Sequence, residues 1–218
     1  MSTKEKTWWI VGGLVIAAYC LLPIAWIVSL SFKAPADLTN ASFLPTRATG
    51  SNYAQIITGD ASDLFLPALR NSFGICLIAT LISCILSMFA AYAIARLDFP
   101  GKKFILSSAL AVAIFPVISI VTPLFNLWRQ IGLYDTWPGL IIPYLSLTLP
   151  LSIWTMSAFF REIPWEMEQA AQVDGATTWQ AFRKVIVPLA APGVFTTAII
   201  AFVFIKGFKV DLTQARGD

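Results

Sequence analysis

The sequence predicts an all-α fold, a polytopic bundle of transmembrane helices. Of its 218 residues, 57% are hydrophobic and only 12% are charged, whereas a soluble domain has about 45–50% apolar and about 25% charged residues. Five runs contain no Asp, Glu, Lys or Arg, and each is long enough to cross about 30 Å of hydrocarbon as a helix. The predicted spans are residues 7–32, 71–95, 104–128, 136–160 and 185–205. This composition excludes both a soluble globular domain and a disordered chain.

We expect the first span, residues 7–32, to be retained as a transmembrane helix. Lys4 and Lys6 give it a basic start, and residues 34–36 resemble a small-residue cleavage site. The apolar core of a signal peptide is about 7–15 residues long, however, and this run is far longer. A retained helix is therefore favoured over a cleaved leader.

The distribution of basic residues indicates how the bundle is oriented in a cell membrane. Short loops on one side carry Lys4, Lys6, Arg96, Lys102, Lys103, Arg161, Arg183 and Lys184. The other side carries Lys33, Arg47 and Arg70 in a longer loop and Arg129 in a short one. Because cytoplasmic loops are enriched in Lys and Arg, we predict that the amino terminus and the segment 161–184 are cytoplasmic.

Polar residues follow one face of each of the third and fourth spans. In the third span these are Ser119, Thr122 and Asn126, and in the fourth they are Tyr144, Thr148, Ser152 and Thr155. Such groups either hydrogen-bond between helices or line a hydrated passage, and the sequence leaves both alternatives open. If they line a translocation path, the absence of charge within the spans favours an uncharged, hydroxyl-rich solute over an ion.

The fifth span and the residues after it depart from the charge pattern. Residues 185–205 contain Pro188 and Pro192 near their cytoplasmic start, and Lys206 and Lys209 follow on the side that should be poor in basic residues. We therefore treat residues 1–205 as the transmembrane domain and 206–218 as an atypical tail. The expectation is that the last helix is held loosely.

The connector 161–184 has the pattern of two short helices joined by a glycine turn. Pro164 suits a first helical turn, and Glu166 and Glu168 suit the positive end of the helix dipole. Gly175 supplies a turn that ends this helix, and Thr177 or Thr178 can cap the next one. We expect Trp165, Met167, Ala170 and Ala171 to give apolar contact area while Glu166, Glu168 and Gln172 stay in water. Such a segment could present a surface to a cytoplasmic partner, or lie on lipid headgroups; its acidic side chains favour the partner.

Several functional classes lack the residues that they require. The chain has no histidine, which excludes imidazole catalysis and histidine metal sites. Cys20, Cys76 and Cys84 stand singly in apolar runs, so we expect packing roles and no metal site. The basic residues form no patch for nucleic acid. A phosphate-binding loop fails near Gly101-Lys102, where Arg96 occupies the first glycine position. We predict no cofactor for this chain.

The connector also resembles the EAA loop of ATP-binding-cassette importer permeases. In that family E-A-A is followed by three residues, a glycine, nine residues and I-x-L-P. The matching residues here are Ala170-Ala171, Gly175, Val185, Val187 and Pro188. Further stretches are similar to the sugar permeases of the maltose and trehalose type: 96–102, Phe115-Pro116, 135–140, 158–164, 174–176 and 181–183. The resemblance extends over residues 7 to about 205.

This resemblance implies a type I importer fold and a transport role without catalysis. The chain would form half of a path for a sugar, such as the disaccharides trehalose or maltose. Implied partners are a second homologous permease, two ATPase subunits, an extracytoplasmic sugar-binding lipoprotein and membrane lipid. The implied residues for coupling to the ATPase are Trp165, Glu168, Gln169, Ala170, Ala171, Asp174, Gly175, Ala176, Phe182 and Pro188.

The sequence departs from the family pattern at two places. Gln169 stands where the family has glutamate, and Glu168 lies one position earlier, about 100° away around a helix. Family members also continue into a sixth helix, whereas residues 206–218 read as a truncated or foreign ending. The alternatives to a working permease are a non-transporting scaffold or assembly subunit, an inactive truncated permease, or a membrane enzyme. The predicted spans contain no cluster of catalytic residues that an enzyme would need.

Overall fold

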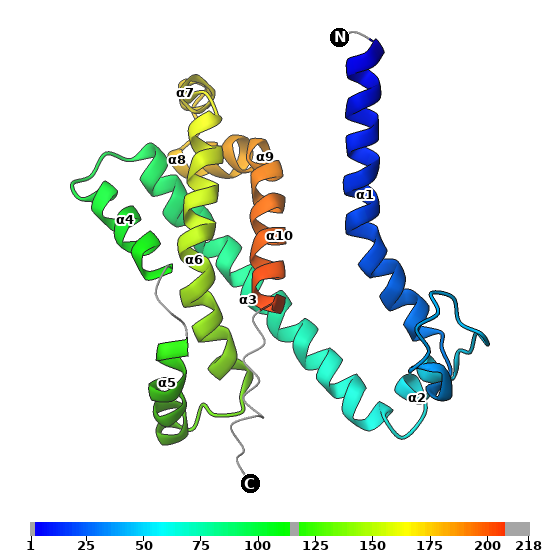
Figure 1. The fold of residues 1–218 in the computed structure, drawn as a ribbon. Coiled ribbons are helices and arrows are strands. Elements are labelled where there is room, and N and C mark those ends of the chain that lie inside the picture. The colour runs from blue at the N-terminus through cyan, green and yellow to red at the C-terminus, as the bar shows by residue number, and fades with distance from the viewer. Residues whose placement is uncertain (1–2, 114–117, 208–218) are drawn as a thin grey trace. The chain divides into compact units, whose positions relative to one another are not determined.

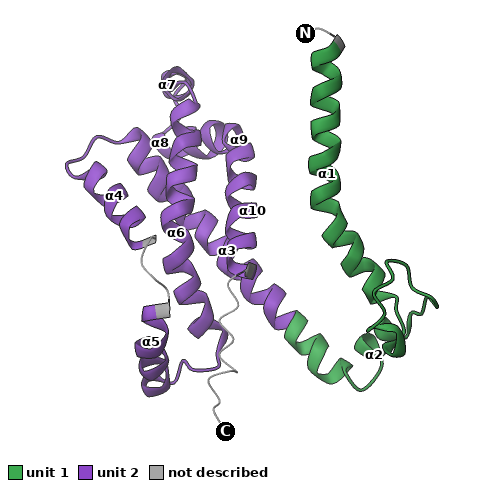
Figure 2. Cartoon of the chain, in the orientation of Figure 1, with its two compact units in different colours: residues 1–69 green, residues 70–218 purple. Residues whose placement is uncertain are grey.

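The computed structural model of the chain describes residues 3–113 and 118–207. Within these ranges the regular elements are helices, apart from a single antiparallel bridge between Lys33 and Ala48. The all-α prediction is therefore confirmed. The family match at Phe115-Pro116 and most of the tail 206–218 lie outside the described residues. The chain divides into two compact units, residues 1–69 and 70–218, with the boundary inside one long helix (Figure 2).

The first unit contains α1 (Thr3–Ser31), a 3₁₀ turn (Pro35–Asp37), α2 (Ser51–Ile57) and the beginning of α3 (Ser62–Arg96). After α1 the chain folds around Lys33, which is only 1% exposed. The ammonium group of Lys33 donates to the carbonyl oxygens of Asn40 and Ser42, each at 2.7 Å. It also lies 5.2 Å from the ring centroid of Trp26. These contacts replace the water that a buried charge loses, so this loop is ordered around its lysine.

The second unit holds the rest of α3 and the remaining helices, in the order shown in Figure 1. They are α4 (Lys102–Ala113), α5 (Ile118–Ile131), α6 (Trp137–Glu162), α7 (Trp165–Val173), α8 (Thr178–Ala181), a π-helical turn (Phe182–Ile186), α9 (Val187–Leu189) and α10 (Ala191–Gly207). Helix α6 packs against both α4 and α10. Tyr144 of α6 shares a buried cluster with Ile75 and Cys76 of α3 and Ile205 of α10.

Three of the five predicted spans correspond to single long helices. By length and composition, Lys4–Ser31, Ser62–Arg96 and Trp137–Glu162 could each cross a membrane. Helix α3 begins before the predicted residue 71 and includes Pro67 and Arg70. The uncharged run therefore marked the apolar part of this helix, which continues as a helix into more polar sequence.

The other two predicted spans are each built from more than one helix. The stretch 104–128 contains most of α4 and α5, on either side of residues 114–117. The stretch 185–205 belongs to a pair of helices, Thr178–Leu189 and Ala191–Lys206, bent by 70° and able to form a fourth candidate span. Pro192 has no N–H to donate to the carbonyl of Pro188, so the helical ladder is interrupted at the bend.

Candidate functional site

Helix α7 ends in the glycine turn that the sequence predicted. Gly175 has a φ of +88°, in the left-handed region that glycine adopts readily. The amide of Ala176 donates to the carbonyl of Ala171 at 2.9 Å, and the amide of Gly175 donates to that of Gln172 at 3.0 Å. This pair of bonds is a Schellman motif, which satisfies the last carbonyls of the helix. Pro164 lies at the N-cap, one position before the helix.

Helix α8 begins with a capping box, which identifies Thr177 rather than Thr178 as its N-cap. The hydroxyl of Thr177 accepts from the amide of Gln180 at 3.2 Å, and the Gln180 side chain accepts from the Thr177 amide at 2.9 Å. The chain then passes without a loop into the π-helical turn Phe182–Ile186. A capping box satisfies two amides that would otherwise lack partners. The glycine turn between α7 and α8 is therefore fixed by local hydrogen bonds at both of its ends.

A buried apolar cluster fixes the π turn that follows α8 to the ends of α3 and α6. Its members are Ala91, Met156, Phe160, Ile163, Phe182, Ile186 and Ala190. The ring of Tyr92 meets that of Phe182 edge to face at 4.7 Å between centroids, and Trp179 stacks on Phe182 at 5.5 Å. Aromatic contacts of this kind add to the energy of apolar burial. The segment 161–184 is thus anchored to the helices on one side.

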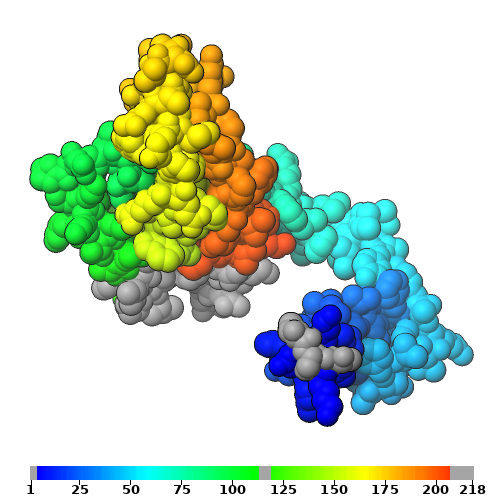
Figure 3. Space-filling model, turned by 90° about the horizontal axis from the view of Figure 1, so that it is seen from above, coloured from blue at the N-terminus to red at the C-terminus, as the bar shows by residue number. Residues whose placement is uncertain are grey.

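Helix α7 lies at the end of the second unit and leaves one side uncovered. Figure 3 looks down on this end, where the yellow to orange surface of residues 161–184 faces the viewer. The exposed side chains include Trp165 at 42% and Met167 at 45%. Beside α7 an apolar groove of about 400 Å³ is lined by Phe159, Glu162, Ile163, Pro164, Met167, Leu189, Ala190 and Pro192. This surface, α7 with its groove, is called the coupling surface below.

The structure separates the predicted coupling residues into two sets. Trp165, Gln169, Ala170, Asp174, Gly175 and Pro188 are exposed, Ala171 and Ala176 are half-buried, and Glu168 and Phe182 are buried. The expectation that Glu168 stays in water is wrong, because this residue is only 2% exposed. Its carboxylate accepts a hydrogen bond from the Tyr92 hydroxyl and lies 3.6 Å from Nε of Arg96. A cation and a hydroxyl from α3 replace the lost water.

Tyr92 and Arg96 are therefore site residues that sequence reasoning missed. Arg96 was noted as a basic loop residue and within the family-like stretch 96–102, but not as a partner of Glu168, and Tyr92 lies inside an apolar span without any polar pattern. Near them, Lys102 donates to the carboxylate of Asp98 at 2.8 Å. This hydrogen bond and the lysine charge lower the pKa of Asp98. Because both side chains reach solvent, the pair stabilises the α3–α4 turn only weakly.

The polar face of α6 contacts α3 within this chain. Tyr144, Thr148 and Ser152 are buried, and Thr155 is half-buried. The Thr148 hydroxyl lies 3.3 Å from that of Ser83 on α3 and donates to the Tyr144 carbonyl at 2.8 Å. Ser83 in turn donates to Ser152 at 3.3 Å. These hydroxyls thus form a hydrogen-bonded seam between two helices, as polar groups in membranes commonly do.

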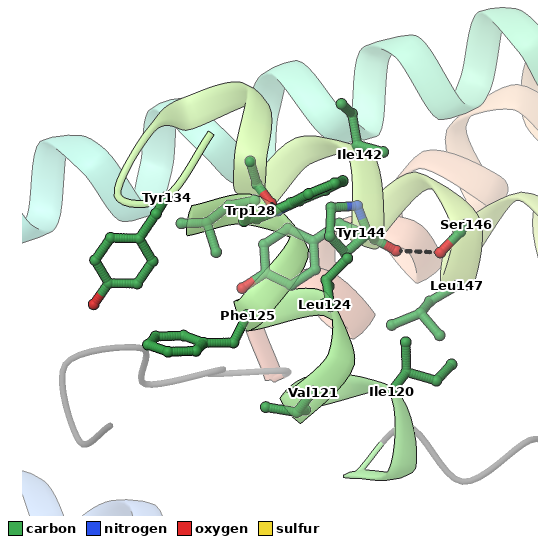
Figure 4. A pocket seen from close by; sticks show the side chains of 13 residues that line it. Ile120, Val121, Leu124, Phe125, Trp128, Tyr134, Ile142, Tyr144, Ser146 and Leu147 are labelled. Atoms are coloured by element: carbon green, nitrogen blue, oxygen red, sulfur yellow. Dashed lines mark hydrogen bonds between the residues drawn. The ribbon is translucent and has the colours of Figure 1, made fainter. Parts of the chain in front are cut away.

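The polar residues of α5 lie on a different face from the one that meets α6. Ser119, Thr122 and Asn126 are exposed. The side of α5 that faces α6 is instead apolar and borders a cavity of about 160 Å³, lined by Ile120, Val121, Leu124, Phe125, Trp128 and residues of α6 (Figure 4). Trp128 closes one end by donating from Nε1 to the Gly139 carbonyl at 2.6 Å. The two predicted polar faces are therefore not brought together in this chain.

A family model and individual relatives show which known proteins this chain is similar to. Residues 83–208 match the family of binding-protein-dependent transport system inner membrane components. The chain is 54% identical to the trehalose transport system permease protein SugB of Mycobacterium tuberculosis, over 94% of this chain and 73% of that protein. It is 41% identical to the sulfoquinovosyl glycerol transport system permease protein SmoH of Agrobacterium fabrum, over 84% of this chain and 64% of that one.

The fold is also found in a solved structure, that of a bacterial ABC transporter involved in the import of the acidic polysaccharide alginate. The match has a TM-score of 0.73 and 25% sequence identity, and it covers 94% of this chain and 72% of that chain. The long apolar helices place the protein in the membrane, and its relatives are transport subunits rather than enzymes. The chain therefore belongs to the family of binding-protein-dependent transport system inner membrane components, the permeases of ABC importers.

Proposed function

We propose that this chain is the permease subunit of an ATP-driven sugar importer, and that its coupling surface docks on a separate ATPase subunit. The observation that carries the proposal is that the segment of α7 and α8 is exposed on one side and packed on the membrane helices on the other. Helices α7 and α8 present exposed apolar side chains outward. A buried apolar cluster joins the π turn after α8 to α3 and α6, and Glu168 joins α7 to α3. A rigid knob of this kind can transfer the motion of a bound partner to the membrane helices as one body.

The nature of the solute is inferred from two features. The five predicted spans contain no charged residue, which favours an uncharged solute over an ion. The relatives named above are described as transporting trehalose and sulfoquinovosyl glycerol, both hydroxyl-rich molecules that contain a sugar. Only trehalose is uncharged, because sulfoquinovosyl glycerol carries a sulfonate. We therefore propose a small glycoside as substrate, with trehalose first among the candidates. A third relative, from Thermococcus litoralis, is named for both trehalose and maltose, which makes maltose the next candidate.

The proposed partners follow from the family description. A binding-protein-dependent system requires an extracytoplasmic binding protein, and an ABC importer requires ATPase subunits. We propose a complex of this chain, a second homologous permease, two ATPase subunits and a sugar-binding lipoprotein. A path between two permeases would be completed by the second one, which agrees with the separation of the polar faces of α5 and α6 in this chain.

Reconstitution of the whole complex in proteoliposomes tests the proposal. The chain is coexpressed with its proposed partners, the second permease, the ATPase and the sugar-binding lipoprotein. ATP hydrolysis and uptake of labelled sugar are then measured in the same proteoliposomes. We expect trehalose to stimulate both, with maltose and sulfoquinovosyl glycerol as competitors that rank the specificity. A catalytically inactive ATPase serves as the control. An assembled complex that responds to none of these sugars would instead support a scaffold role.

A further inference from the structure

A buried ion pair lies where α7 meets the carboxyl-terminal end of α3. Nε of Arg96 and Oε2 of Glu168 are 3.6 Å apart, and their side chains are only 5% and 3% exposed. Glutamate and arginine are rarely this buried unless they are paired. The two residues are far apart in sequence, so the pair links two separate elements of the fold.

Further contacts extend this pair into a joint of three elements. Tyr92, one turn before Arg96 on α3, donates its hydroxyl to Oε1 of Glu168. Arg96 donates from Nη2 to the carbonyl of Ile163 at 2.8 Å, in the turn between α6 and α7. The Arg96 guanidinium also lies 5.0 Å from the ring centroid of Trp165, in the first turn of α7. One guanidinium thus touches the end of α6, the start of α7 and the carboxylate of Glu168.

The energetics of buried ion pairs argue that this joint determines position more than stability. Replacing a buried pair by apolar residues is often neutral or stabilising, whereas removing one partner leaves an uncompensated charge. Among the described residues, Nε of Arg96 and Oε2 of Glu168 make no hydrogen bond. The direct link between them is therefore Coulombic, and it constrains where α7 sits without requiring one exact hydrogen-bond geometry.

We infer that Arg96, Glu168 and Tyr92 are positioning residues that make α7 move together with α3. This inference rests on the proposed function, since it assigns the route by which motion at the coupling surface reaches a membrane helix. Glu168 then acts within its own chain and does not bind the ATPase. The ATPase would instead contact the exposed side of α7, which carries Gln169 and Ala170.

The test compares Glu168→Gln with Asp98→Asn in the reconstituted complex. Asp98 lies two residues after Arg96, is fully exposed and stands outside the coupling surface, so it is the matched control. For Glu168→Gln we expect ATPase capture within about twofold of the native level, and sugar uptake per ATP hydrolysed lower by about tenfold. Tyr92→Phe, which removes a single hydroxyl, should lower the same ratio by about threefold. Asp98→Asn, which removes only a weak exposed pair with Lys102, should leave both quantities unchanged.

A double variant separates a joint from two independent structural roles. The single variants Arg96→Met and Glu168→Met each break the link between α3 and α7. The double variant, Arg96→Met with Glu168→Met, should therefore lower the uptake per ATP hydrolysed no further than the more damaging of the two single variants. Should Glu168→Gln fail to reach the membrane, Tyr92→Phe and the double variant decide the matter. Native uptake per ATP in the variants that assemble would overturn the inference, and so would loss of ATPase capture in Glu168→Gln. Failure of the proposed function would instead appear as a native complex without uptake.

Discussion

A chain carrying Gly175→Val should reach the membrane at the native level but transport sugar about 5–30-fold more slowly. The native φ of +88° at this residue is strained for any side chain, and more so for a β-branched one. Apart from its two chain neighbours, no residue described by the structure places an atom within 4 Å of a Cβ built there, so the penalty comes from the backbone alone. It amounts to about 1–2 kcal/mol. The Schellman turn would then give way to other conformations, and α7 would lose its fixed angle to α8.

The matched control for this position is Gly175→Asn, because asparagine tolerates the left-handed region better than valine does. It should retain at least half of native uptake, as measured with labelled sugar in the same proteoliposomes. In the valine variant ATP hydrolysis should be uncoupled from sugar uptake, so that adding sugar no longer stimulates hydrolysis. Native uptake by Gly175→Val would show that this turn does not transmit motion.

Gly193→Ala should destabilise the second unit by about 1–3 kcal/mol, although alanine is the better helix former. A Cβ at this residue of α10 would lie 2.5 Å from Cγ of Phe159 on α6, and 2.8 Å from its Cβ. These atoms are at the base of the phenylalanine side chain, so rotation of the ring cannot relieve the clash. Helix α10 would have to move away from α6 near the bend, which should also reduce assembly with partner subunits.

The control for the second variant is Gly13→Ala, in the middle of α1. Beyond the adjoining backbone of α1, no atom of the residues that the structure describes lies within 4 Å of a Cβ built at Gly13, so this change has only the helix-propensity effect. Replacement of glycine by alanine at a compatible site stabilises by about 0.4–1 kcal/mol. The two substitutions should therefore shift the midpoint of thermal unfolding in detergent in opposite directions. Equal midpoints for both variants would contradict the packing of α10 on α6 described above.

Local patterns predicted the helices and turns that local physics determines. The charge-free runs located α1, α3 and α6, because a membrane span needs sustained apolar sequence. The proline, glycine and threonine of the segment 161–184 predicted a helix, a left-handed turn and a second helix, and the structure has all three. Pro188 and Pro192 marked the place of the bend at Ala190 in the sequence, and the structure gives its angle of 70°.

Contacts between distant residues could not be read from local patterns. The burial of Glu168 depends on Arg96 and Tyr92, which belong to another helix. The order of the loop after α1 similarly depends on Lys33 meeting the carbonyl oxygens of Asn40 and Ser42. A charged residue in a sequence is expected in water because most are, and only tertiary structure reveals the exceptions. The sequence therefore predicted the helix, turn and helix of the segment 161–184 but not the burial of Glu168 within it.

Site-specific cross-linking from α7 tests the central claim, that its exposed side binds the ATPase. A photoreactive amino acid is introduced at Gln169, which is exposed on α7, and at Thr46, which is exposed in the loop that should lie outside the cell. Irradiation of intact cells that express the whole complex should link Gln169 to the ATPase subunit and should give no such product from Thr46. A cross-link from Thr46 to the ATPase, or none from Gln169 in an assembled complex, would contradict the account.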